Sequence, residues 1–347
     1  MNQQNYMPPY DGSAWYVPAW ADPQKLEQKE LRRASSRLSF AVLASLPIQM
    51  LLSMLASLLL MFCGVNLYAL GANSIGGFPA TAYYLLSSVV SFVSIVLPFS
   101  FFLFLGKRRL EDTILVEKTG ALNGVLLVFA GLFVCMIMNI PANLISQLLE
   151  QAGLNGAVNT ESFTVNSAAD LVTMFLSVVL VAPVTEEFAF RGVTAAVMRR
   201  WGDWPAVIFS ALIFAMAHYS FQALPVVLMG GFVMALLYVR TRNIWINIFV
   251  HFLNNLIATL PIAVEYLFGT DAAQIADNAA FFAVVGFGIS ALVILLVRHF
   301  TGHPVFRSPM QHGIPVRNKA LQLVVNPGFI TYFVCFIAMA VIALYAV

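Results

Sequence analysis

Residues 171–192 read LVTMFLSVVLVAPVTEEFAFRG, an apolar run that ends in two carboxylates and an arginine. A hydrocarbon core requires about 20 apolar residues in an α-helix, and this run is long enough. Lipid offers no partners to backbone N–H and C=O groups, so a segment that crosses the membrane must satisfy them internally, as a helix does. The stretch therefore predicts a membrane helix that carries charged side chains.

The composition of the whole chain is that of a membrane protein. Of its 347 residues, 60% are hydrophobic and only 10% are charged, against about 25% charged residues in soluble domains. The net charge of +2 gives no indication of a nucleic-acid partner, and the three cysteines lack the spacing of a disulfide framework or a metal site. We expect an all-α, polytopic bundle in the cell membrane with about 8–9 transmembrane helices.

Nine apolar segments are long enough, or nearly so, to cross the membrane, although the fifth is short for a full span. Lys and Arg cluster in every second connection, so the positive-inside rule places the N-terminus in the cytoplasm and, with nine spans, the C-terminus outside. The segments are 40–64, 80–106, 120–148, 171–192, 204–219, 221–239, 244–264, 279–297 and 328–347. The basic clusters are 25–37, 107–109, 199–200, 240–242 and 298–319.

The chain divides into a polar tail and one membrane domain. Residues 1–38 are expected to form a cytoplasmic N-terminal tail, because the apolar run that follows begins at Phe40. That run is longer than a signal-peptide core of about 7–15 residues, so it is interpreted as an uncleaved first span. Residues 39–347 then form a single membrane domain with its functional core at about 170–264, since no internal repeat or long linker divides it.

Three polar cassettes interrupt the apolar segments of this core. Carboxylates, imidazoles and amides are costly at membrane depth unless they pair with one another or perform chemistry. Residues four apart share a face of a helix, so Glu187 and Arg191 are predicted to form an ion pair, while Glu186 points about 100° away. The cassettes are Glu186 to Arg191, Phe214 to His218 and His251 to Asn255.

The first two cassettes flank a predicted turn. Residues 199–205 read RRWGDWP, and a proline at this position suits the start of the next helix. Glu186 lies sixteen residues before Gly202 and His218 sixteen residues after it. A tight antiparallel hairpin would bring this carboxylate and imidazole to one depth, which favours a functional histidine over a structural one. Phe214, four residues before His218, is expected to pack against the imidazole.

The third cassette adds donors from another helix. His251 and Asn255 are four residues apart and share a face, whereas Asn254 points elsewhere and is expected to form a helix–helix hydrogen bond. Glu186 and His218 have the chemistry of a general base and a proton shuttle, and His251 and Asn255 that of oxyanion donors. With no Ser or Cys nucleophile in the cassettes, this set predicts hydrolysis of a peptide bond by water.

A metal-bound water is an alternative that the sequence leaves open. Two histidines and a glutamate are suitable zinc ligands, and the candidates here are Glu186, His218 and His251. No His-Glu-x-x-His motif occurs in the chain, so these ligands would have to converge from three helices.

The cassettes resemble the signature motifs of the CPBP family of intramembrane proteases, also called the CAAX-processing or Abi family. Glu186-Glu187-x-x-x-Arg191 resembles EExxxR, Ser210-x-x-x-Phe214-x-x-x-His218 resembles FxxxH with its upstream serine, and His251-x-x-x-Asn255 resembles HxxxN. The similarity covers about residues 170–262. Members include type II CAAX prenyl endopeptidases and bacterial relatives implicated in bacteriocin immunity.

The resemblance implies that Glu186 and His218 activate the water, with Glu187 and Arg191 in support, and that His251 and Asn255 stabilise the oxyanion. The family is commonly labelled as metalloproteases, yet a metal-free mechanism is also argued for it, so zinc stays open as a cofactor. The N-terminal tail, the outer loop before the fourth span and the last span lie outside the motif region. The resemblance does not imply that the substrates of this chain are prenylated.

Three functions remain as alternatives. The first is an intramembrane endopeptidase that cleaves peptides or membrane-associated proteins from the cytoplasmic side. The second is a non-catalytic immunity or scaffold protein of the same fold. This alternative is weakened because it does not explain why six polar groups converge. The third is a proton-coupled transporter with a buried Glu–His relay, which is weakened because the chain lacks an inverted repeat.

Overall fold

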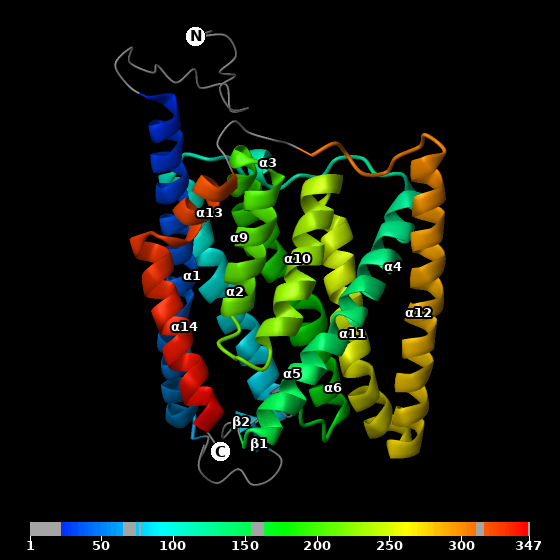
Figure 1. Cartoon of the computed structure of the whole chain (residues 1–347). Helices are drawn as coiled ribbons and strands as arrows, with labels where there is room; N and C mark the ends of the chain where they lie inside the picture. Colours follow the sequence, from blue (N-terminus) through cyan, green and yellow to red (C-terminus); the bar gives the residue numbers. More distant parts are fainter. Residues whose placement is uncertain (1–21, 65–73, 76–77, 154–162, 310–315, 346–347) are drawn as a thin grey trace.

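The computed structural model describes residues 22–64, 74–75, 78–153, 163–309 and 316–345, which form a bundle of long helices (Figure 1). Within these ranges, seven helices are long and apolar enough to cross a membrane, or eight if the bent pair at the C-terminus is one span. The expected all-α, multi-pass membrane architecture is therefore confirmed. Two short antiparallel strands, β1 (Ser74–Ile75) and β2 (Phe78–Pro79), lie at one end of the bundle.

The helices follow the predicted apolar segments in order. Before the motif region they are α1 (Pro23–Phe62), α2 (Ala80–Leu105), α3 (Leu110–Thr113), α4 (Ala121–Ile137) and α5 (Asn139–Gln151). One long helix follows, made of α6 (Ala168–Met174), η1 (Phe175–Val181), α7 (Ala182–Glu187), η2 (Phe188–Ala195), α8 (Ala196–Met198) and η3 (Arg199–Trp201). The rest are α9 (Asp203–Met216), α10 (Leu224–Thr241), α11 (Ile244–Phe268), α12 (Thr270–Phe300), α13 (Val316–Val324) and α14 (Pro327–Tyr345).

The first helix begins well before the predicted apolar run. The side chain of Asp22 caps α1 by accepting a hydrogen bond of 2.9 Å from the Gln24 backbone N–H, and Pro23 follows at the first helical position. Residues 23–38, expected in the polar tail, are therefore helical, and their Leu31 and Leu38 are fully buried. Residues 1–21 of the predicted tail lie outside the described residues.

The third and fifth predicted segments agree with the prediction in length. The segment 120–148 has a turn at Met138, between α4 and α5, and Ala121–Ile145 is nevertheless long and apolar enough to cross a membrane. The fifth segment becomes α9, whose 14 residues span about 21 Å, short of a hydrocarbon core of about 30 Å. The prediction that the fifth segment is short for a full span is therefore confirmed.

The long helix from Ala168 to Trp201 contains two π-helical stretches, η1 and η2, which flank the short α7. In a π-helix each N–H pairs five residues back, and such turns occur frequently at functional sites. The Thr194 hydroxyl follows this spacing and donates to the Ala189 carbonyl over 3.0 Å. Sequence reasoning treated the span as an ordinary α-helix and missed these turns.

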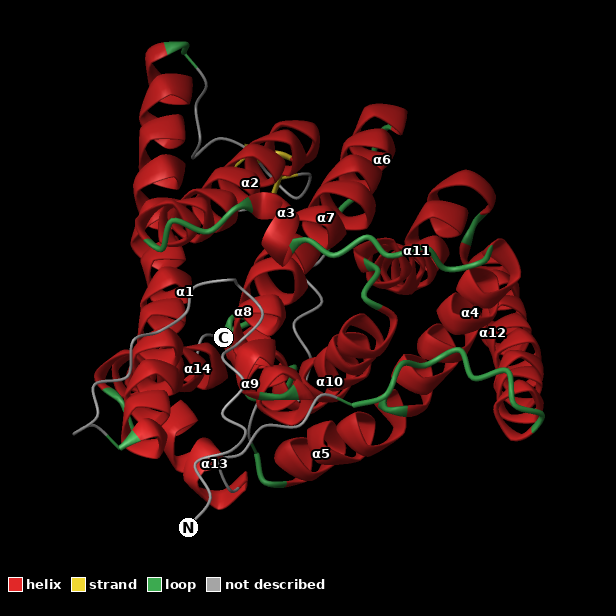
Figure 2. Ribbon diagram, turned by 90° about the horizontal axis from the view of Figure 1, so that it is seen from above, coloured by secondary structure: helices red, strands yellow, loops and turns green. Residues whose placement is uncertain are grey.

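The predicted hairpin turn at Gly202 is confirmed. Gly202 has a φ of +116°, a conformation that glycine adopts readily and other residues avoid. An ion pair of 2.9 Å between Arg199 and Asp203 joins the two sides of the turn. Seen from above, α9 and α10 lie between α1 and α12, which are at opposite edges of the bundle (Figure 2).

The C-terminal helices pack back onto α1 and α9. A bend of 61° separates α13 from α14, and Asn326 at this bend donates to the Ser35 hydroxyl of α1 over 2.7 Å. On α14, the Tyr332 hydroxyl donates to the Ile213 carbonyl of α9 over 3.1 Å. These contacts link the last helices to α1 and to α9, the helix that precedes His218.

Candidate active site

The predicted ion pair between Glu187 and Arg191 is confirmed. Arg191 Nη1 lies 2.8 Å from Glu187 Oε1, and both side chains are fully buried. A buried pair of charges is tolerated only where its attraction and additional hydrogen bonds offset the loss of water. Further partners are therefore expected around both groups.

Arg191 finds its further partners on α9 and α10. Its Nη2 donates to the Gly231 carbonyl over 3.2 Å, and its guanidinium carbon lies 4.4 Å from the centroid of the Phe214 ring. A Cβ at Gly231 would lie 2.9 Å from Phe214 Cδ1. Glycine at this position thus lets α10 approach the Phe214 ring and the arginine beneath it.

His251 lies between the two carboxylates of the first cassette. Its Nδ1 is 2.9 Å from Glu187 Oε1, and its Nε2 is 3.7 Å from Glu186 Oε2. An ionised carboxylate only accepts hydrogen bonds, so we assign a proton to Nδ1. The longer contact exceeds hydrogen-bond length, which leaves the Nε2 side of the ring as the one that faces a reactant.

Glu186 is the more accessible of the two neighbouring carboxylates. Its side chain is 20% exposed, whereas that of Glu187 is 0% exposed. This separation agrees with the prediction that Glu187 pairs with Arg191 and that Glu186 faces another direction. Glu186 thus remains available to a water or a ligand beside His251.

His218 lies in a different environment, exposed in the turn that follows α9. Its Nδ1 is 3.0 Å from the Phe214 carbonyl, and its ring meets the Phe214 ring edge-on with centroids 5.1 Å apart. The expected packing of Phe214 against this imidazole is therefore confirmed. Because a carbonyl only accepts, we assign the proton to Nδ1, which leaves a lone pair on Nε2.

The hairpin brings Glu186 close to the depth of His218. On η2, Phe190 accepts a hydrogen bond of 2.7 Å from the Ser210 hydroxyl and contacts the Phe214 ring at 5.0 Å. Glu186 lies four residues farther from the turn than Phe190 and is therefore level with the last turn of α9. No carboxylate oxygen of the described residues lies within 4.0 Å of a His218 nitrogen; the imidazole that approaches Glu186 to 3.7 Å is His251.

Asn255 connects α11 to a π-helical stretch. Its Nδ2 donates to the Val178 carbonyl of η1 over 2.9 Å. Asn254 was expected to form a helix–helix hydrogen bond, and this prediction is wrong, because its amide donates to neighbouring Asn255 over 3.4 Å. The shared face of His251 and Asn255 thus points toward η1 and α7, and the bond between helices comes from Asn255.

Sequence reasoning missed two residues that complete the buried cluster. Asn247 is fully buried and donates to the Met234 carbonyl of α10, and Gly231 supplies the carbonyl that Arg191 binds. Asn247 lies four residues before His251, so its position on the same face was a usable signal. No sequence feature indicated that the Gly231 carbonyl would accept from an arginine.

The side chains do not fit a metal centre as they are arranged. Among the residues that the structure describes, no group of three His, Cys, Asp or Glu side chains is positioned to hold a metal ion. His251 and His218 each hold Nδ1 on a protein acceptor and leave Nε2 free, as many metal-ligating histidines do, but the described side chains do not converge on a common point with Glu186. The alternative of a zinc site built from Glu186, His218 and His251 therefore receives no support from the geometry.

Comparisons with known proteins identify the same region of the chain. The family described as type II CAAX prenyl endopeptidase Rce1-like matches residues 168–257, which include the three cassettes. A protein of Bacillus subtilis (strain 168), named "Putative membrane peptidase YdiL", is 28% identical over 132 residues, or 38% of this chain. The match covers 53% of that relative, so the chain spans about half the length of the curated protein it matches.

No solved structure matches the chain with statistical significance. The matched segment runs from α6 into α11 and carries all seven residues predicted for the site. The resemblance predicted from the motifs is thus confirmed: residues 168–257 of this multi-pass membrane protein are similar to the family described as type II CAAX prenyl endopeptidase Rce1-like.

Proposed function

We propose that the protein is an intramembrane endopeptidase that hydrolyses a peptide bond of a peptide or a membrane-associated protein. One observation carries the proposal: an accessible carboxylate, Glu186, lies 3.7 Å from an imidazole that a buried carboxylate orients from its other side. The pairing of Glu187 with Arg191 would by itself satisfy a structural role. An additional accessible carboxylate at this depth is costly unless it performs chemistry.

Glu186 is the general base of the proposed reaction. It takes a proton from water as the water oxygen attacks the carbonyl carbon of the substrate, and the carbonyl oxygen becomes an oxyanion. The C–N bond then breaks, and a proton must reach the leaving amine. His218 shuttles it, because its Nε2 carries a lone pair and its exposed position at the end of α9 lets it reach a bound peptide.

His251 and Asn255 are the proposed donors to the oxyanion. His251 directs Nε2 toward the oxyanion, and the neighbouring carboxylate of Glu187 holds its Nδ1 from 2.9 Å away. Asn255 uses one amide hydrogen for the Val178 carbonyl, and its second remains for the substrate. Donors fixed by such contacts stabilise the developing charge without having to reorganise during the reaction.

Arg191, Glu187 and Phe214 act as positioning residues. Arg191 neutralises Glu187, so that Glu187 orients His251 without adding an unbalanced buried charge. The Phe214 ring separates the two imidazoles, with centroids 5.1 Å from His218 and 6.1 Å from His251. No step is assigned to a metal ion, because the described donors do not converge on one.

The test compares purified wild type with Glu186→Gln and His218→Ala on a quenched peptide library in detergent. Loss of a general acid or base lowers the rate by about 10²–10⁴-fold, and we expect losses of this order for both variants. His299→Ala is the matched control, since His299 is exposed in the last turn of α12, outside the matched segment. Cleavage at the wild-type rate by both site variants would refute the assignment.

A further inference from the structure

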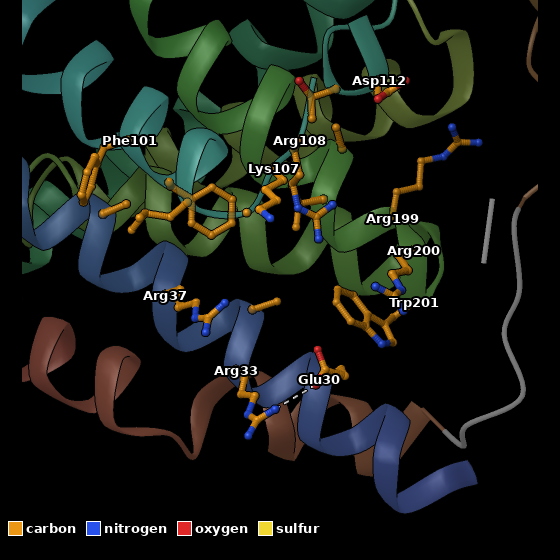
Figure 3. A pocket seen from close by; sticks show the side chains of 18 of the residues that line it. Glu30, Arg33, Arg37, Phe101, Lys107, Arg108, Asp112, Arg199, Arg200 and Trp201 are labelled. Atoms are coloured by element: carbon orange, nitrogen blue, oxygen red, sulfur yellow. Dashed lines mark hydrogen bonds and ion pairs between the residues drawn. The ribbon is translucent and has the colours of Figure 1, made fainter. Parts of the chain in front are cut away.

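A cleft of about 1400 Å³ opens beside α1 at the end of the bundle that carries the Gly202 turn (Figure 3). Its walls come from α1, the last turns of α2, the segment that follows α2, and the stretch from Ala196 to Trp201. None of the residues assigned to the peptidase site lines it. The cleft is therefore separate from the site proposed above, and its occupant does not depend on that proposal.

The rim of the cleft is basic. Seven Lys or Arg residues line it against four Asp or Glu residues, and Figure 3 shows six of these cations around the opening. Three of the four carboxylates are already paired with arginines. The cations in the figure are Arg33, Arg37, Lys107, Arg108, Arg199 and Arg200. The pairs are Glu30 with Arg33, Glu111 with Arg109, and Glu117 with Arg242 and Arg307.

Two of the cations are not neutralised. Arg37 and Lys107 are exposed, and no carboxylate oxygen among the described residues lies within 4.0 Å of either. Lys107 follows α2 by two residues with a φ of +48°, and its N–H donates to the Phe104 carbonyl, so the backbone holds this residue at the rim. The positive-inside rule predicts that this basic end faces the cytoplasm.

The wall below the cations is apolar. Phe40 of α1 and Phe101 of α2 are 45% and 58% exposed, and Leu105 is 65% exposed. Ala41 and Ala44 are small, so they leave space between the two helices. Positive charge at the membrane boundary above an apolar wall is complementary to an amphiphile with an anionic head and a hydrocarbon tail.

We propose that this cleft binds an anionic phospholipid of the surrounding bilayer. Its phosphate contacts Arg37 and Lys107, and an acyl chain lies along Phe40 and Phe101. Basic pockets between transmembrane helices on the cytoplasmic side bind acidic headgroups in this way. The lipid would join α1 to the end of α2 and to the helix that carries the motif glutamates, since all three form the walls.

The experiment measures binding of phosphatidylglycerol to the full chain in detergent by native mass spectrometry and by the shift in Tm. We expect phosphatidylglycerol to bind and raise the Tm, and phosphatidylcholine and inorganic phosphate to leave it unchanged. Each Lys or Arg near an anionic surface contributes about 1 kcal/mol, so Arg37→Gln with Lys107→Gln should weaken binding about thirtyfold.

The matched control is Lys29→Gln with Arg32→Gln, which removes the same charge from exposed positions of α1 that do not line the cleft. This control should bind phosphatidylglycerol as the wild type does, and circular dichroism verifies that both double variants are folded. Equal weakening in the two double variants would indicate a diffuse charge effect and overturn the proposal. An equal Tm shift with inorganic phosphate would overturn it as well, because it would identify a free anion as the occupant.

Discussion

The two motif histidines lie in opposite environments. His251 is in the interior of α11, 6% exposed, with a carboxylate on each side of its ring. His218 follows the last turn of α9, exposed, and is held by the carbonyl and the ring of Phe214. The buried imidazole has a fixed orientation, and the exposed one has access to a substrate.

This difference separates two tasks that a peptidase needs. A group that stabilises developing charge must be fixed before the reaction begins, whereas a group that carries a proton must reach both a water and a leaving amine. The buried network around His251 suits the first task, and the end of a short helix suits the second. Variants that damage one environment should therefore leave the other intact.

The largest effect on stability is expected at the buried side of this comparison, for Arg191→Ala. Removing one partner of a buried ion pair leaves an uncompensated charge and costs about 3–5 kcal/mol. Glu187 would then be buried without its cation and would no longer orient His251. Unfolding in a denaturing detergent gradient measures the loss.

Two controls sharpen this prediction. Arg33→Ala breaks an exposed pair with Glu30, and such pairs contribute about 0–1 kcal/mol. Glu187→Gln combined with Arg191→Met removes both charges and should recover part of the stability. If Arg191→Ala is no more destabilising than Arg33→Ala, the buried network does not have the structural role assigned to it.

The local part of this site follows from the sequence. The pair of Glu187 with Arg191 depends on a four-residue spacing within one helix, and the turn at Gly202 depends on residue types within a few positions. Both predictions are confirmed because neither requires knowledge of how helices rotate against one another. Spacing also identified the face shared by His251 and Asn255.

The long-range part could not be derived in the same way. The contact between Glu187 and His251 joins residues 64 positions apart, so it depends on the rotation of α11 about its axis. It depends as well on the helix that carries Glu187, where the π-helical stretches η1 and η2 change the rotation of the residues that follow them, and no residue pattern marked these stretches. Asn254 was misassigned for the same reason, since one step along a helix changes the face by about 100°.

A second prediction concerns Gly231, which lies between the two environments. A Cβ there would lie 2.9 Å from Phe214 Cδ1, so Gly231→Ala should displace the Phe214 ring at a cost of about 1–3 kcal/mol. The displaced ring would disturb both imidazoles, because it contacts each of them. The free energy of unfolding and the rate of peptide cleavage should therefore both fall, and denaturant unfolding and a cleavage assay measure them.

Gly230→Ala is the matched control, since a Cβ at Gly230 would have open space around it. Alanine also favours the helix relative to glycine by about 1 kcal/mol, so this variant should be as stable as the wild type or more so. Wild-type stability and cleavage for Gly231→Ala would contradict the close packing of α10 on Phe214.

The smallest effect is expected at the exposed side, for Tyr332→Phe on α14. The Tyr332 hydroxyl donates to the Ile213 carbonyl in the last turn of α9, and its ring contacts Tyr219, the residue after His218, at 6.3 Å between centroids. Loss of one hydrogen bond costs about 1 kcal/mol. Because α14 lies outside the matched segment, this variant tests whether a flanking helix positions His218.

We expect Tyr332→Phe to lower kcat several-fold with little change in KM, since it alters the placement of the proton shuttle and leaves the buried network intact. Thr331→Val is the matched control, because it removes a neighbouring hydroxyl that donates within α14, to the Pro327 carbonyl. A fall in kcat that is equal in both variants would mean that α14 affects stability alone. A fall confined to Tyr332→Phe would mean that the position of the exposed histidine depends on a helix far from the motifs in sequence, whereas the buried histidine is fixed within them.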